Sequence, residues 1–200
     1  MNKQNKYKKF LVFIIGKLIF SFGISFGNRS LFGGNPMAVF VVGLSKHLPL
    51  SVGTCNLIVA FFEIVIGTIL DSKHTTWVSW VAMVVGSYLI DFANLFVPVT
   101  DVFVTRTIYM LVGIVFYCFG LALEQIANIG YSNLDVFIYG IKKATKVKKY
   151  HTAKWFVDIM FIIGGFLLKA EIGIGTVLII LVAGLLIEFF KSKLTLLIKE

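Results

Sequence analysis

The chain has 200 residues, of which 58% are hydrophobic and only 14% are charged, and its formal net charge is +9. A soluble domain carries roughly a quarter charged residues, so this composition excludes a water-soluble globular protein and predicts an integral membrane protein in a lipid bilayer. The basic residues flank the apolar runs instead of forming one patch, which argues against a nucleic-acid partner.

The first predicted span covers residues 10–26 and follows a group of lysines. A signal peptide also opens with basic residues, but no small-residue cleavage site follows this run, so we expect a retained helix. Lys17 lies inside the span. Its ammonium group either extends to the cytoplasmic interface, which we favour, or faces the interior and pairs with a carboxylate.

Two short segments of the chain, residues 33–46 and 130–143, resemble each other. Gly, Val, Phe, Gly and Lys recur in them at an offset of 97 residues, and further matches continue downstream at an offset of 98. A nearly constant offset predicts two repeats of about 97 residues, at about 10–97 and 107–190, within a single membrane domain covering residues 1–200.

The helical part of the first short segment begins at Pro36 and has about ten residues, which is about half of the hydrocarbon thickness. Asn35 is suited to cap this helix, and Pro36 suits its first position. A broken or re-entrant helix is therefore our interpretation. The alternatives are an ordinary tilted span and a helix lying at the membrane interface.

In the second short segment, Ser132 or Asn133 would cap the helix, and Asp135 would lie in its first turn, where the helix dipole favours a carboxylate. Short helices at matching positions of two repeats indicate a binding site in transporters. We therefore predict that the substrate-binding residues are Asn35, Pro36, Asn133 and Asp135.

The remaining predicted spans cover residues 50–70, 77–97, 107–123, 155–168 and 172–190. Three carboxylates lie within them, Glu63, Asp91 and Asp158. A charge in hydrocarbon is unfavourable unless it is paired or hydrated. These carboxylates, with Lys17 as a possible partner, are our candidates for ion or proton coupling.

Lysines are concentrated at the N-terminus, in the linker 142–154 and near the C-terminus. The positive-inside rule places all three segments in the cytoplasm, beside anionic lipid headgroups. Two topologies satisfy this rule: six spans with re-entrant short helices and inverted halves, or eight crossings with parallel halves. The short length of the helices favours six spans, in a multi-pass protein of the bacterial plasma membrane with both termini cytoplasmic.

Catalytic signatures are missing from the sequence, which contains no HExxH, Gly-x-Ser-x-Gly or P-loop pattern. The three histidines and two cysteines show no metal-ligand spacing. We therefore expect no enzymatic activity, no cofactor and no metal.

Several glycine-rich motifs link the chain to a known family. They are Gly33-Gly34-Asn35-Pro36, Val39-Phe40 with Gly43-Leu44-Ser45, Ser51-Val52-Gly53-Thr54, Asp135-Val136-Phe137, Gly164-Gly165 and Gly173-Ile174-Gly175-Thr176. With these motifs the chain resembles the YczE/YyaS/YitT-type family of multi-spanning bacterial membrane proteins. The resemblance implies a plasma-membrane protein whose activity is not established.

These observations predict an all-α integral membrane protein with six transmembrane helices and two short broken or re-entrant helices. They favour the movement of a small solute through a site between the short helices, as in a transporter or channel. The alternative is a membrane scaffold or regulatory subunit that docks a cytoplasmic partner through the basic linker 142–154.

Overall fold

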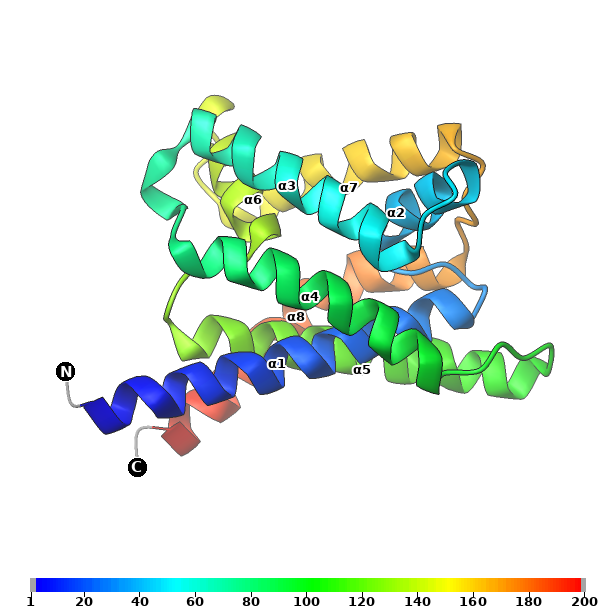
Figure 1. Ribbon diagram of the computed structural model, residues 1–200, viewed down its shortest axis with the longest axis horizontal. Coiled ribbons are helices and arrows are strands. Elements are labelled where there is room, and N and C mark those ends of the chain that lie inside the picture. The colour runs from blue at the N-terminus through cyan, green and yellow to red at the C-terminus, as the bar shows by residue number, and fades with distance from the viewer. Residues whose placement is uncertain (1–2, 199–200) are drawn as a thin grey trace.

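The computed structural model describes residues 3–198, which form eight α-helices and one short 3-10 turn and contain no β-strand. The helices are α1 (Lys3–Arg29), α2 (Pro36–His47), α3 (Val52–Leu70), α4 (Trp77–Phe96), α5 (Phe103–Ala127), α6 (Asn133–Ala144), α7 (Tyr150–Leu167) and α8 (Ile174–Ile198) (Figure 1). The predicted all-α class is confirmed.

Five of these helices are long and apolar enough to cross a membrane: Tyr7–Arg29, Val52–Leu70, Trp77–Phe96, Phe103–Ala127 and Ile174–Thr195. The predicted span at 155–168 lies in α7, which has 18 residues but does not reach this level of hydropathy. His151, Lys154 and Asp158 in its first half are the reason. The membrane class is therefore supported, but by length and composition there are five spans instead of the six we predicted.

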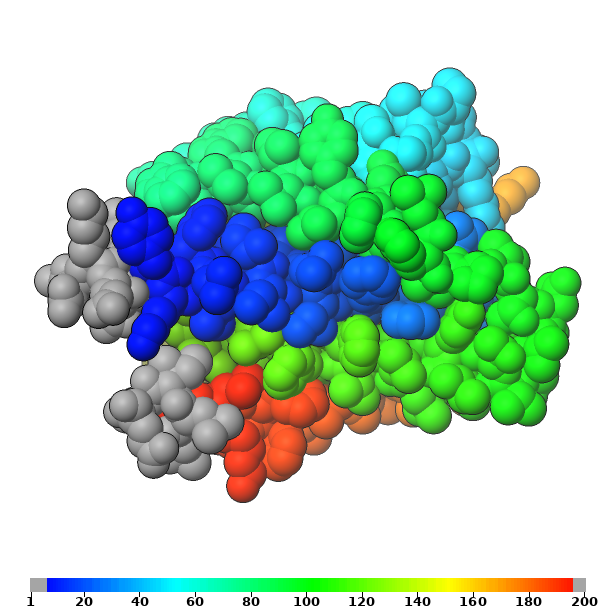
Figure 2. Space-filling model, turned by 60° about the horizontal axis from the view of Figure 1, so that its bottom comes forward, coloured from blue at the N-terminus to red at the C-terminus, as the bar shows by residue number. Residues whose placement is uncertain are grey.

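Apolar side chains cover much of the outer surface, as expected for helices in contact with lipid. Leu11, Ile69, Leu95, Leu167 and Leu185 are all more than half exposed. Figure 2 shows the face of the molecule on which α1 lies between α4 and α5.

Helices α1 and α5 pack along each other and run in opposite directions (Figure 1). Glycines permit the close approach: a Cβ atom added to Gly120 would lie 2.5 Å from the backbone nitrogen of Phe20. Small residues of this kind are the usual basis of tight helix pairs in membranes. Helices α4 and α2 pack on α1, and α8 packs on α5.

The two short helices pack reciprocally, α2 against α7 and α6 against α3. Each begins in the interior and ends at a surface, at opposite ends of the molecule (Figure 1). The end of α2 is held by Lys46, whose Nζ lies 3.2 Å from Oε1 of Glu171, and the end of α6 by Lys143, whose Nζ lies 3.2 Å from Oδ1 of Asp71.

Side-chain caps start both short helices, as the sequence predicts. Asn35 Oδ1 accepts a hydrogen bond of 3.0 Å from the backbone N–H of Ala38, and Pro36 occupies the first turn. In α6 the capping residue is Ser132, whose Oγ accepts a hydrogen bond of 3.2 Å from the backbone N–H of Asp135. Asn133 is thereby free to use its side chain elsewhere.

Candidate functional site

The N-terminal ends of α2 and α6 meet at one small internal cavity. Its volume is about 20 Å³, and its polar lining includes Asn35, Asn133, Lys17 and Asn56. This is roughly room for one water molecule. We call it the central cavity.

A larger cavity of about 500 Å³, here called the vestibule, lies at the end of the molecule that carries both termini. It is bounded by α1, α5, α8, the loop before α6, and α6 and α7 themselves. Ser132 lines both the vestibule and the central cavity. The two spaces are therefore neighbours, separated by the start of α6.

Asp135 lies in the wall of the vestibule and is buried. Its Oδ1 accepts a hydrogen bond of 2.5 Å from the hydroxyl of Tyr150, and its Oδ2 accepts one of 3.0 Å from Ser132 Oγ. Within the described part of the chain no basic group pairs with this carboxylate. Its negative charge is held by hydroxyl groups and by the positive end of the α6 dipole.

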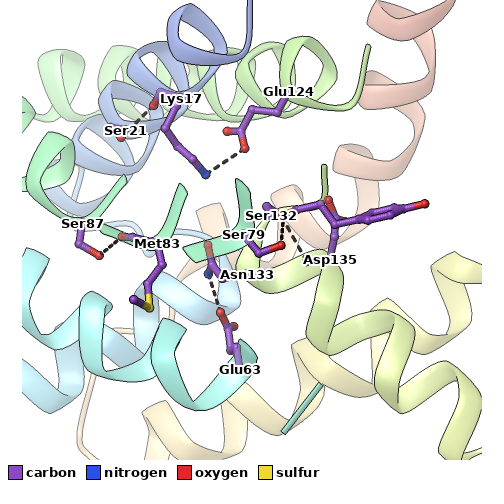
Figure 3. A network of polar contacts seen from close by, with 11 residues as sticks. Lys17, Ser21, Glu63, Ser79, Met83, Ser87, Glu124, Ser132, Asn133 and Asp135 are labelled. Carbon is purple, nitrogen blue, oxygen red and sulfur yellow. Dashed lines mark hydrogen bonds and ion pairs between the residues drawn. The ribbon is translucent and has the colours of Figure 1, made fainter. Parts of the chain in front are cut away.

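Asn133 connects α6 to α3 through the buried carboxyl group of Glu63. Its Nδ2 donates a hydrogen bond of 2.6 Å to Glu63 Oε2 (Figure 3). The other carboxyl oxygen of Glu63 is buried without a hydrogen-bond partner. Glu63 therefore contacts Asn133, which lines the central cavity, and its Oε1 atom can still accept a hydrogen bond.

Lys17 forms a buried ion pair, so our expectation that it extends to the interface is wrong. Its Nζ lies 2.9 Å from Oε2 of Glu124, and each side chain is only 3% exposed. Neither oxygen of Glu124 accepts a hydrogen bond of good geometry. Figure 3 shows the two side chains pointing toward each other from α1 and α5. Interior pairing prevails because α1 continues in both directions past Lys17 and packs on α5.

Glu124 is the site residue that sequence analysis missed. The predicted fourth span ended at residue 123, whereas α5 continues to Ala127 and carries Glu124 into the interior. The sequence feature that could have indicated its role is the glycines of α1 and α5, because Gly16 and Gly120 let the two helix backbones approach each other beside the ion pair.

The other predicted residues lie apart from these cavities. Asp91 anchors the start of α3, accepting hydrogen bonds of 2.5 Å from Ser51 Oγ and 2.8 Å from the backbone N–H of Gly53. Asp158 pairs with Lys154 of its own helix at 2.6 Å. Pro36 is buried at the start of α2 but lines neither cavity. The structure thus brings together Lys17, Asn35, Glu63, Asn133 and Asp135.

No set of three potential metal-ligating side chains occurs within the residues that the structure describes. The polar centre can instead hold a small polar molecule through amides and hydroxyl groups, and hold or exchange a proton through carboxyl groups.

Long apolar helices around a buried polar centre define the class as a polytopic α-helical membrane protein. Within this class the chain belongs to a family of unknown function, DUF6198, which matches residues 7–192. This agrees with the resemblance seen in the sequence, since YyaS is among the relatives.

Two relatives extend over nearly the whole chain. The chain is 26% identical over 194 residues to the uncharacterized protein YyaS of Bacillus subtilis (strain 168), covering 91% of this chain and 92% of YyaS. It is 23% identical over 187 residues to an uncharacterized protein of Haemophilus influenzae, covering 94% of this chain and 85% of that protein. No solved structure matches the chain.

Proposed function

We propose that the protein moves a small solute across the bacterial plasma membrane through the space between its two short helices. One observation carries this proposal: Asn35 and Asn133, at the starts of two helices that enter from opposite ends, line the same cavity. Broken helices that meet in the interior form the binding sites of many transporters. The protein acts by binding and conformational change and has no enzymatic activity.

The proposed topology has six spans, with α7 as the sixth, and two inverted halves. In support, α1 and α5 correspond in the repeats and run in opposite directions. The short helix of each half also packs on the following helix of the other half, α2 on α7 and α6 on α3. A twofold axis in the membrane plane would produce both features.

The proposed orientation places both termini in the cytoplasm. The lysines at the N-terminus, in the linker 142–154 and near the C-terminus then lie inside, beside anionic lipid headgroups. The vestibule lies at the same end of the molecule as the termini. The conformation described therefore faces the cytoplasm in this orientation.

The ion pair between Lys17 and Glu124 is the proposed inner gate. Glu124 lines the vestibule, whereas Lys17 lines the central cavity. On the other side of Asn35 lies a further space of about 10 Å³, which is too small for a solute, so the proposed outward path is closed in this conformation. Separation of the two charges would join vestibule and central cavity.

A cysteine in place of Ser132 tests the proposal without knowledge of the solute. Cys55 and Cys118 are first replaced by Ala, and single cysteines at Ser72 and Lys169 serve as markers of the inner and outer faces. A membrane-impermeant thiol reagent should reach Ser72 only from inside and Lys169 only from outside. It should reach Ser132 from both sides, because an alternating transporter exposes its centre to each face in turn.

A scaffold or regulatory subunit gives the opposite result. Its centre has no reason to open outward, so Ser132 would react from the cytoplasmic side alone. Partner capture would then depend on the basic linker 142–154, most of which is exposed. Labelling of Ser132 from one side only would therefore overturn the transport proposal.

A further inference from the structure

Aromatic rings form one wall of the vestibule. Tyr131, Tyr139 and Tyr150 all line it. The ring centroid of Tyr139 lies 5.2 Å from that of Tyr131 and 5.4 Å from that of Tyr150. Phe13 contributes a fourth ring from α1. The faces of such rings carry partial negative charge and attract cations.

Carboxyl groups outnumber basic groups in the same wall. Glu124, Asp135 and Glu188 line the vestibule, against Lys191 alone among its lining residues. Glu188 is exposed, whereas Glu124 and Asp135 are more than nine-tenths buried. The vestibule is therefore a concave, acidic and aromatic space.

Both buried carboxylates of the vestibule retain capacity to accept hydrogen bonds, although Glu124 already pairs with Lys17. Among the described residues, the carboxylate of Asp135 accepts hydrogen bonds only from the hydroxyl groups of Ser132 and Tyr150. Glu124 has an Oε1 atom that accepts no hydrogen bond. Buried carboxylates are usually paired or fully hydrogen-bonded, because an unpaired charge away from water is unfavourable.

We propose that the vestibule binds a small organic cation, an amine or a quaternary ammonium compound, with its charged group between Asp135 and the tyrosine rings. This inference rests on the proposed function, because it names the class of solute that the protein moves. A volume of about 500 Å³ is within the range of small-molecule sites, roughly 300–1,000 Å³.

An anion fits the same space poorly. The positive end of the α6 dipole already faces the carboxylate of Asp135, and the ammonium group of Lys17 already faces Glu124. Lys191, on α8 beside the exposed Glu188, is the basic group left in the wall. Of the residues that the structure describes, the buried charged group of the vestibule without an oppositely charged side chain is the carboxylate of Asp135.

Binding of choline to the full chain in lipid nanodiscs, measured by calorimetry, tests this directly. The matched probe is 3,3-dimethylbutan-1-ol, which has the same shape without the charge. We expect choline to bind at least about tenfold more tightly, because the aromatic rings and the carboxylate both favour the charged probe. Equal affinity for both probes, or no choline binding, would overturn the inference.

Variants locate the site. Asp135→Asn should weaken choline binding about tenfold or more. The matched control is Glu171→Gln, an exposed carboxylate in the loop between α7 and α8 at the opposite end of the molecule from the termini, and it should not change binding. Tyr139→Leu should weaken binding, whereas Tyr139→Phe, which retains the ring, should preserve it. Unchanged affinity in both Asp135→Asn and Tyr139→Leu would contradict the proposed site.

Flux of labelled choline into proteoliposomes separates this inference from the proposed function. Binding without flux, together with one-sided labelling of Ser132, would retain the cation site but defeat transport. Two-sided labelling of Ser132 without binding of choline would retain transport but defeat the organic-cation inference.

Discussion

Lys17 and Glu124 form an ion pair of 2.9 Å between α1 and α5, and each side chain is 3% exposed. The pair stands between two cavities, with Lys17 in the wall of the central cavity and Glu124 in the wall of the vestibule. The same contact therefore joins α1 and α5 and contributes one side chain to the wall of each cavity.

Removal of one partner of this pair should strongly destabilise the fold. Lys17→Met leaves Glu124 as an isolated buried charge, which typically costs about 3–5 kcal/mol. The double variant Lys17→Met with Glu124→Leu should recover most of this loss, because apolar pairs of similar volume replace buried ion pairs well. Denaturant unfolding in mixed micelles measures the free energy of unfolding of the wild type, of Lys17→Met and of the double variant.

The exposed pair formed by Lys46 and Glu171 is the matched control. Its side chains are 43% and 57% exposed, so Lys46→Met should change the unfolding free energy by no more than about 1 kcal/mol. If Lys17→Met were as mild as Lys46→Met, the Lys17–Glu124 pair would not hold α1 and α5 together.

The glycines of the α1–α5 contact should be sensitive to a single added methyl group. A Cβ atom at Gly120 would lie 2.5 Å from the backbone nitrogen of Phe20, so Gly120→Ala should destabilise the fold by about 1–3 kcal/mol through overpacking. Nothing lies within 4 Å of a Cβ atom at Gly184 of α8.

Gly184→Ala is therefore the control for Gly120→Ala. It should be neutral or should stabilise the fold by up to about 1 kcal/mol, because alanine favours a helix over glycine. Thermal unfolding in detergent compares the two variants. Similar effects of both substitutions would show that α1 and α5 tolerate a wider spacing.

Asp71, in the loop after α3, should contribute to stability in a pH-dependent way. Burial raises the pKa of its carboxyl group, but hydrogen bonds from Lys143 and the backbone of Lys73, and the charges of Lys143 and His74, outweigh burial and leave the pKa below its ordinary value. A carboxylate with a lowered pKa stabilises the fold above its unfolded pKa of about 3.9 and loses this contribution as the pH falls through the folded value.

The expected result is a difference in melting temperature between wild type and Asp71→Asn that is constant near neutral pH. This difference should shrink as the pH falls below about 4. In a Lys143→Gln background the decrease should be smaller, since the main partner of Asp71 is lost. A difference that grows under acid conditions would show that the pKa is raised instead.

The short helices and their caps could be predicted because their signals are local. Asn35 before Pro36, and Ser132 three residues before Asp135, are capping patterns that need no tertiary contact. The partner of Lys17 could not be predicted, because it depends on how α1 and α5 lie against each other. Glu124 also falls just beyond the apolar run, and a rule based on hydropathy ends the helix before it.

The low hydropathy of α7 also has to be judged together with the contacts of its side chains. Its polar first half lowers the hydropathy of the whole helix, yet Lys154 and Asp158 neutralise each other at 2.6 Å. An i,i+4 pair of this kind reduces the penalty of placing both charges near lipid. A count of charged residues registers two charges where the structure contains one ion pair, and this pairing supports the proposal that α7 is the sixth span.

Glu63→Gln should separate coupling from folding. The glutamine side-chain oxygen can still accept the hydrogen bond that Asn133 donates to Glu63, so stability should change by less than about 1 kcal/mol. Glutamine cannot exchange a proton, however. If Glu63 couples transport, a pH gradient should no longer drive accumulation of the solute in proteoliposomes, whereas exchange of internal for external solute should continue.

Glu63→Leu is the structural comparison, because it leaves the buried amide of Asn133 without its acceptor and should cost about 1–3 kcal/mol. Accumulation by Glu63→Gln at the wild-type level would assign coupling to another carboxyl group, with Asp135 the next to be tested.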